Sequence, residues 1–286
     1  MTPNTPNRNG PMKLLVATLL TLTAASTAMA QSLAHPLAVA ADGKGAVYVA
    51  DRKLPGVSKI VAGKVSVVFQ ASKKFRTPLN AVQSIALGAD GRLLVGDSAT
   101  RQVYRIGDDG KPTPLLTNKV GIGIPIDLAI DSQGTIFVAD LELHRLWKVP
   151  AAGGEPKEVA AIAAIRAIAV DKQDRVWVLT SGEKTIQRLT ADGKSETIVS
   201  KRTFRFPNDI EVDAAGTAYV SDAYSHAVWK IESGKDPVKW VEGDPLQIPV
   251  RMTLAGTDLL LADSRAKQIL RIAPDGKVSA LVSATP

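Results

Sequence analysis

The sequence contains no cysteine. This absence excludes a disulfide framework, a thiolate metal site, a cysteine nucleophile and a lipidated N-terminal cysteine. Histidine is nearly as scarce, with His35, His144 and His226 as its three occurrences. His144 and His226 stand at the same position of two similar segments, in the turn before a third hydrophobic run. We therefore assign these two histidines a turn role rather than metal ligation or acid–base catalysis.

After residue 30 the chain lacks any apolar run long enough to cross a bilayer. The one earlier apolar run follows Lys13, covers residues 14–27 and leads into the small-residue sequence Ala-Met-Ala at 28–30. A positive charge, a short apolar run and a small-x-small sequence are typical of a cleavable secretory signal peptide. We predict that residues 1–30 are such a signal peptide, that the protein is periplasmic or secreted, and that it has no stable membrane anchor.

Composition and charge describe the mature part of the chain, residues 31–286. Charged residues make up 22% and hydrophobic residues 45% of the full chain, which is typical of a globular protein. The formal net charge is +7, and the signal peptide contributes Arg8 and Lys13 but no acid, so the mature chain carries +5. Met12, directly before Lys13, offers a second start codon besides Met1.

The mature chain repeats one pattern six times. Each copy has an alternating hydrophobic run, a tight turn and a second run rich in β-branched or aromatic residues, as in LAIDSQGTIFVAD. An aspartate at a strand end hydrogen-bonds the backbone of the following turn, so we interpret the aspartates that end the second run as structural rather than as calcium ligands. In the six copies the second run ends at Asp51, Asp97, Asp140, Thr180, Asp222 and Asp263, at intervals of 46, 43, 40, 42 and 41 residues.

Each copy continues with a third and a short fourth run. Four runs per copy predict a twisted antiparallel sheet, and six such sheets at this spacing predict an all-β, six-bladed β-propeller. Residues 158–170 have a composition that suits a helix, but their place in the array predicts the end of one blade and the start of the next. The predicted blades cover residues 36–70, 79–117, 123–161, 164–200, 206–242 and 248–284.

The segment IPIDLAIDSQGTIFVADLELHRLWKV, residues 124–149, resembles the NHL-repeat propellers. More distantly, the chain is similar to the senescence-marker-protein/gluconolactonase superfamily, which shares the propeller architecture. The resemblance covers all six copies and is weakest in residues 164–189. Because propellers support unrelated activities, this resemblance bears on the fold much more than on the function.

The resemblance also implies that the first strand of each blade lines a central channel. One equivalent position of these strands holds Ala38, Ser84, Asp127, Ala167, Asp209 and Arg251. The position just before it holds Leu37, Gln83, Ile126, Arg166, Asn208 and Val250. Many copies keep these two positions small or apolar, so polar residues there are the candidates for a binding surface at the channel mouth. They are Ser84, Asp127, Arg166, Asn208, Asp209 and Arg251.

Superfamily members that hydrolyse lactones or esters hold a divalent cation with Glu, Asn and Asp from different blades. The sequence PNDI at residues 207–210 is similar to their asparagine motif. The resemblance thus implies a calcium site of Asn208, Asp209 and Asp127, in which the metal would polarise a carbonyl and activate water. The first blade has an apolar residue in place of their glutamate, and the sixth has Arg251 in place of their aspartate. A guanidinium repels a cation, so a salt bridge with the aspartates is the alternative.

Two loops interleave cations with phenylalanine. They are SKKFRTP, residues 72–78, and SKRTFRFP, residues 200–207. We expect both at the channel mouth, where they could bind anionic polymers, phosphate-bearing surfaces or acidic proteins, although a solvated rim is the alternative reading. The cations assigned to this surface are Lys73, Lys74, Lys201 and Arg202. Nucleic acid is not an expected partner of an exported protein without a gene-regulatory fold.

The sequence therefore predicts an exported, monomeric binding or interaction module whose ligand or partner surface lies at the channel mouth. Its partner is a small molecule, an anionic polymer or a protein. The competing hypothesis is a calcium-dependent lactonase or esterase of the gluconolactonase type, and a third is a lyase or other sugar-processing enzyme on the same scaffold. No cofactor other than calcium is expected.

Overall fold

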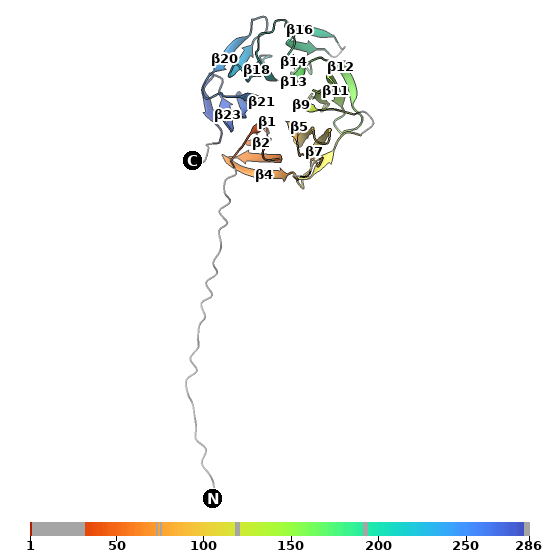
Figure 1. Ribbon diagram of the computed structural model, residues 1–286, viewed down its shortest axis with the longest axis vertical. Helices are drawn as coiled ribbons and strands as arrows, with labels where there is room; N and C mark the ends of the chain where they lie inside the picture. The colour runs from red at the N-terminus through yellow and green to blue at the C-terminus, as the bar shows by residue number, and fades with distance from the viewer. Residues whose placement is uncertain (2–31, 73, 75, 118–120, 191–193, 283–286) are drawn as a thin grey trace.

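The computed structural model describes residues 1, 32–72, 74, 76–117, 121–190 and 194–282. Within these residues, 24 β-strands form six four-stranded antiparallel sheets, arranged as blades around a central axis (Figure 1). The predicted all-β, six-bladed propeller is confirmed. The predicted signal peptide concerns a segment of which only Met1 is among the described residues. In the described part of the chain, no helix combines the length and apolar character needed to cross a membrane.

The blades follow one another along the chain, with four consecutive strands in each. The first three blades contain β1 Pro36–Ala41, β2 Ala46–Asp51, β3 Gly56–Val61, β4 Lys64–Gln70, β5 Val82–Leu87, β6 Leu93–Asp97, β7 Gln102–Ile106, β8 Pro112–Pro114, β9 Pro125–Ile130, β10 Ile136–Asp140, β11 Arg145–Val149 and β12 Lys157–Ala161. The last three contain β13 Ile165–Val170, β14 Val176–Thr180, β15 Ile186–Leu189, β16 Ser195–Val199, β17 Pro207–Val212, β18 Ala218–Asp222, β19 Ala227–Ile231, β20 Val238–Glu242, β21 Pro249–Ala255, β22 Asp258–Asp263, β23 Gln268–Ile272 and β24 Val278–Ala280.

The first strand of each blade lies nearest the axis, and the fourth forms the outer rim (Figure 1). The inner strands β1, β5, β9, β13, β17 and β21 contact their neighbours around a closed ring. The helix-like segment 158–170 is split between β12 and β13, as its place in the array predicts. Tertiary packing overrides its local composition there, because β13 buries Ile165, Ala167 and Ile168 between neighbouring blades.

The hydrophobic core is divided into six clusters, one between each pair of adjacent blades. The cluster that closes the ring joins Val39 and Val49 of blade one to Leu260 and Ile269 of blade six. Within residues 32–282, all four strands of the sixth blade come from the C-terminal end of the chain, with β24 outermost. Side-chain packing therefore closes the ring without a strand shared between the two ends of this segment.

The aspartates at the ends of the second strands connect two loops each. The Asp222 carboxylate accepts hydrogen bonds from the backbone N–H groups of Arg205 (2.8 Å) and Phe206 (2.9 Å), which precede the inner strand of its blade. It also accepts hydrogen bonds from the backbone and hydroxyl of Ser225 in its own turn. The same pattern recurs at Asp51, Asp97, Asp140 and Asp263. The structural interpretation of this series is confirmed.

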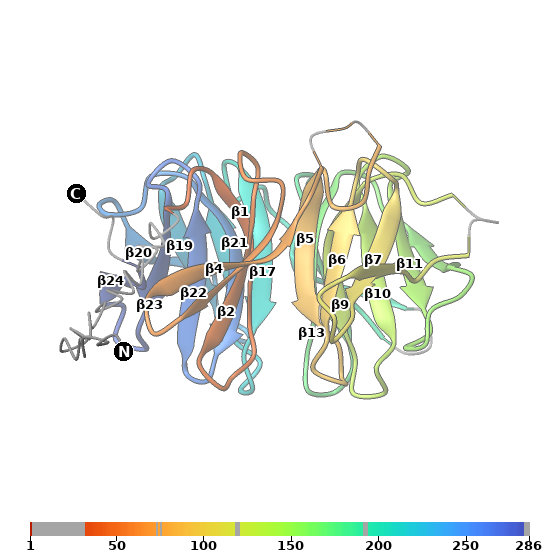
Figure 2. The same cartoon turned by 90° about the horizontal axis from the view of Figure 1, so that it is seen from below.

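The two ends of the ring differ in what they carry. We call one end the loop face: it holds the segments that lead into the inner strands, such as residues 200–206, and the loops after the second strands. The opposite end, the turn face, holds the tight turns between first and second strands, such as residues 42–45. In the side view the loop face is at the top (Figure 2).

Candidate functional site in the central channel

The inner strands present two layers of side chains to the axis. Pairing with the second strands gives all six inner strands the same register. The first layer, nearer the loop face, is Ala38, Ser84, Asp127, Ala167, Asp209 and Arg251. The second layer, two residues further along each strand, is Ala40, Ala86, Ala129, Ala169, Glu211 and Thr253.

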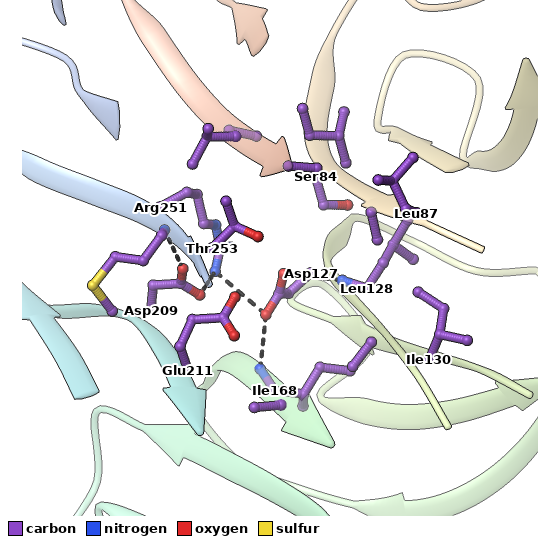
Figure 3. A pocket seen from close by; sticks show the side chains of 18 of the residues that line it. Ser84, Leu87, Asp127, Leu128, Ile130, Ile168, Asp209, Glu211, Arg251 and Thr253 are labelled. Atoms are coloured by element: carbon purple, nitrogen blue, oxygen red, sulfur yellow. Dashed lines mark hydrogen bonds and ion pairs between the residues drawn. The ribbon is translucent and has the colours of Figure 1, made fainter. Parts of the chain in front are cut away.

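Arg251 crosses the channel in the first layer. Its Nη1 lies 2.9 Å from Asp209 Oδ1 and 3.5 Å from Asp127 Oδ2. The same guanidinium donates hydrogen bonds to the backbone carbonyls of Asn208 (3.0 Å) and Ile126 (2.5 Å), so it connects blades six, five and three. Only 5% of the Arg251 surface is exposed. The guanidinium therefore supplies the positive charge between the two aspartates (Figure 3).

The first-layer carboxylates also connect neighbouring blades through backbone donors. Asp209 Oδ2 accepts from the N–H of Met252 at 2.6 Å, and Asp127 Oδ2 accepts from the N–H of Ile168 at 2.8 Å. Ser84 makes the analogous connection by donating its hydroxyl proton to the carbonyl oxygen of Pro125 at 2.8 Å. These contacts satisfy buried polar groups and hold the inner strands in register with one another.

A β-bulge at the start of each inner strand explains why two consecutive residues reach the channel mouth. In β17 the register with β18 shifts between Pro207 and Asp209, leaving Asn208 as the extra residue. Asn208 Oδ1 accepts a hydrogen bond from Arg166 Nη2 at 2.9 Å, and Asn208 Nδ2 donates to the carbonyl oxygen of Pro249 at 3.1 Å. The bulge thus directs Asn208 and Arg166 into a second set of contacts, closer to the loop face.

The residues proposed as calcium ligands do not fit a divalent cation in this arrangement. The side-chain oxygen of Asn208 faces the guanidinium of Arg166, while Asp209 and Asp127 face the guanidinium of Arg251. Calcium needs six to eight oxygen ligands, and both guanidinium groups would repel it. Among the residues that the structure describes, no group of three or more His, Cys, Asp or Glu side chains is placed to hold a metal ion.

Burial shifts the pKa values of the ionisable side chains in the channel. Burial raises the pKa of Asp209 to about 7 and also raises the pKa of Asp127, against the opposing effect of Arg251. Burial favours the neutral form of Arg251, but the carboxylates of Asp127 and Asp209 outweigh it and raise the pKa of Arg251. Burial and the positive charge of Arg251 lower the pKa of Arg166. Arg251 thus stays positively charged, and both the Asp127 and the Asp209 carboxylate interact with this one charge.

A cavity of about 270 Å³ extends from the first layer toward the turn face (Figure 3). The inner strands alone line it, and the six bulge residues, including Asn208 and Arg166, are not among its lining. The channel is therefore open on the side opposite to the one that the sequence analysis favoured, because Arg251 and its partners fill the first layer. We call this space the turn-face cavity; its polar lining residues are Ser84, Asp127, Asp209, Glu211, Arg251 and Thr253.

Glu211 is the functional candidate that the sequence analysis missed. It is the only charged residue of the second layer, where the four other strands before β21 contribute alanine. Burial, followed by the nearby Asp209 and Asp127 carboxylates, raises the pKa of Glu211 well above its ordinary value. A comparison of the residues two positions after the first layer in all six repeats would have identified Glu211 from the sequence.

A second pocket, of about 200 Å³, lies on the loop face between blades four and five. Arg166, Arg202 and Arg205 line it together with Phe206, and we call this group the arginine cup. The guanidinium of Arg166 lies 5.0 Å from the centroid of the Phe206 ring. The cup brings Arg166 and Arg202 of the predicted binding surface together.

The remaining predicted cations are distributed over the loop face. Lys201 and Lys74 are exposed, and Lys73 lies outside the described residues. The loop that contains Lys74 joins blades one and two, and the loop that contains Lys201 joins blades four and five. These junctions are on opposite sides of a six-bladed ring, so the two basic loops do not form one continuous patch.

Comparison with known proteins identifies the fold. No family model matches the chain, and no curated protein matches it. Among solved structures, virginiamycin B lyase from Staphylococcus aureus is similar at 17% identity and a TM-score of 0.65, over 90% of this chain and 88% of that one. A gluconolactonase from Xanthomonas campestris is similar at 18% identity and a TM-score of 0.68, over 82% and 84% of the chains. A chain of a nidogen/laminin complex gives 17% identity and a TM-score of 0.69, over 80% and 91%.

At these identities the similarity shows a shared six-bladed propeller and leaves the activity undetermined. The expected resemblance to gluconolactonase-like propellers is confirmed at the level of the fold. The three similar structures include two enzymes and a protein–protein complex.

The raised pKa of Glu211 predicts how stability depends on pH. A carboxyl group whose pKa is raised by folding stabilises the folded state below its unfolded pKa, and this advantage is lost as the pH rises through the folded pKa. We expect Glu211→Gln to leave the melting temperature unchanged near pH 4 and to raise it by about 2 °C or more at pH 8, which corresponds to roughly 1 kcal/mol in a domain of this size. Thermal unfolding followed by circular dichroism measures both values.

The exposed residue Glu155 provides the matched control, because Glu155→Gln removes a carboxylate in solvent. Its melting temperature should follow that of the wild type at both pH values. An equal or lower melting temperature of Glu211→Gln at pH 8 would contradict the unfavourable burial of the Glu211 charge.

Proposed function

We propose that the protein is an exported, metal-independent binding module that takes an anionic ligand on its loop face, at the arginine cup. The single observation that supports this proposal best is the ion pair of Arg251 with Asp209 and Asp127. It places a guanidinium where the hydrolase hypothesis requires a divalent cation. Export is inferred from the signal-peptide pattern in residues 1–30.

The charge of the arginine cup is not neutralised by its surroundings. Arg166 donates its hydrogen bonds to uncharged oxygens, namely the Pro207 carbonyl at 3.3 Å and the Asn208 amide. In the described part of the chain, Arg202 and Arg205 have no ion pair with a carboxylate. Three guanidinium groups around one pocket without an acid are complementary to a carboxylate, sulfate or phosphate group, which each can bind through two parallel hydrogen bonds.

Two exposed aromatic rings border the same cations. Phe206 is 51% exposed and lies against Arg166, while Tyr224 is 66% exposed and has the Arg205 guanidinium 5.0 Å from its ring centroid. Stacking holds the guanidinium planes in fixed orientations without consuming their hydrogen-bond donors. The rings also offer apolar surface to the part of the ligand that adjoins its acid group. This combination supports a ligand-binding surface over a merely solvated rim.

The alternative function is a calcium-dependent lactonase or esterase. It is supported by the PNDI sequence at residues 207–210 and by the shared fold with a gluconolactonase. It requires Arg251 and Arg166 to leave the oxygens that they now contact. A calcium titration distinguishes the two proposals.

Calcium should not stabilise the wild-type protein. We expect 5 mM calcium chloride to leave the melting temperature within about 1 °C of its value in EDTA, because the proposed ligands already contact guanidinium groups. If calcium did bind, a concentration one hundred times its dissociation constant would stabilise the protein by roughly 2.7 kcal/mol and raise the melting temperature by several degrees. Differential scanning fluorimetry measures the shift. A calcium-induced rise that Asn208→Ala abolishes would refute metal independence and favour the hydrolase.

The arginine cup should dominate retention on an anionic polymer. We expect the wild type to be retained on immobilised heparin and the double variant Arg202→Ser/Arg205→Ser to elute at a clearly lower salt concentration, because both substituted cations lack a carboxylate partner. The control is Lys44→Ser/Lys64→Ser, which removes the same net charge from two exposed residues away from the cup, one between β1 and β2 and the other at the start of β4. Equal losses of retention in the two double variants would show that net charge alone acts, and would overturn the cup as a binding site.

A further inference from the structure

The turn-face cavity is independent of the loop face and carries a chemistry of its own. Its second layer consists of Ala40, Ala86, Ala129 and Ala169, with Glu211 and Thr253 completing the circle. The four alanine side chains leave space around the axis that larger residues would fill. The wall is therefore apolar around most of its circumference, with one carboxylate and one hydroxyl on adjacent blades.

Glu211 has no hydrogen bond or ion pair within the described residues, and its side chain points into the cavity (Figure 3). The neighbouring polar groups are already occupied. Asp209 accepts from Arg251 and the Met252 N–H, and Asp127 accepts from the N–H groups of Ile168 and Leu128. Glu211 is thus the one carboxylate of the cavity left available for a ligand.

The charge balance of the channel favours a cation there. The charged groups that face Glu211 are Asp209 on its own strand, Asp127 on β9 and Arg251 on β21; the second-layer residues of β1, β5, β9 and β13 are alanines. Three carboxylates accompany one guanidinium, so a second positive charge in the cavity would balance an excess of negative charge at the partly buried Glu211. The raised pKa of Glu211 agrees with this excess of negative charge, because protonation of the carboxylate is the other way to remove it.

We infer that the turn-face cavity is a binding site for a small organic cation, namely a primary ammonium group that pairs with Glu211 and a short alkyl chain that packs against the alanine wall. The volume of about 270 Å³ is below the range of about 300–1,000 Å³ typical of pockets for drug-sized ligands, so the ligand is a compact one. An ammonium group matches a single carboxylate and a hydroxyl acceptor, because it offers three donors from one compact charge. The alkyl part distinguishes such a ligand from a bare metal ion.

Titration of the full-length mature protein with n-butylammonium chloride tests the inference. Isothermal titration calorimetry at pH 8 should give saturable binding, and Glu211→Gln should weaken it at least tenfold. Lowering the pH should weaken the affinity by up to about tenfold per unit once the pH is below the pKa of Glu211, because the carboxylate must be ionised. In methyl NMR spectra, the resonances of Ala40, Ala86, Ala129 and Ala169 should shift during the titration.

Chemical and variant controls make each outcome decisive. n-Butanol, n-butyrate and potassium chloride should not produce the same methyl shifts, and Glu155→Gln should bind n-butylammonium as the wild type does. Glu211→Gln is expected to be at least as stable as the wild type at pH 8, so loss of binding in that variant is not loss of folding. Absence of binding at 10 mM n-butylammonium, binding retained by Glu211→Gln, or an equal response to potassium would overturn the inference. None of these results depends on the arginine cup or on export.

Discussion

The ion pair of Arg251 with Asp209 and Asp127 is the contact on which the centre of this propeller depends. A buried guanidinium and two buried carboxylates are each costly to remove from water, and each is tolerated here because the other groups are present. The remaining hydrogen-bonding capacity of the group is directed at backbone atoms of neighbouring blades, including the Met252 and Ile168 N–H groups. The charges therefore fix the relative position of four inner strands, β9, β13, β17 and β21, and they determine which parts of the channel are left open.

The first consequence is that the two faces of the ring have different chemistry. On the loop face, the bulge residues and the loop at 200–207 form a pocket surrounded by guanidinium groups and exposed rings. On the turn face, below Arg251, the channel is a small space with an alanine wall and an unpaired carboxylate. The proposals for an anion on one side and a small organic cation on the other follow from the same division of the channel by one arginine.

Much of this arrangement could be predicted from the sequence. The spacing of the aspartates that end the second strands identified six repeats, and the four hydrophobic runs in each repeat predicted four-stranded blades. The register of the repeats also identified Asp127, Asp209 and Arg251 as first-layer neighbours, and the salt bridge was one of the two alternatives. Glu211 was missed because only two adjacent positions of each inner strand were compared, and Glu211 lies two residues beyond the second of them. The side on which the channel is open depends on the reach of the Arg251 side chain across the axis, and the grouping of Arg166 with Arg205 depends on a β-bulge. Neither is visible in the sequence pattern.

The most direct measurement of the central claim is the free energy of unfolding of Arg251→Leu beside that of the triple variant Arg251→Leu/Asp127→Asn/Asp209→Asn, by urea denaturation at pH 8. Breaking a buried ion pair from one side leaves uncompensated charges and typically costs about 3–5 kcal/mol, whereas replacing the whole pair by well-packed uncharged residues of similar volume costs much less. We therefore expect a large loss of stability in the single variant and recovery of most of it in the triple variant. A loss below about 1 kcal/mol in Arg251→Leu, or a triple variant less stable than the single one, would contradict the account.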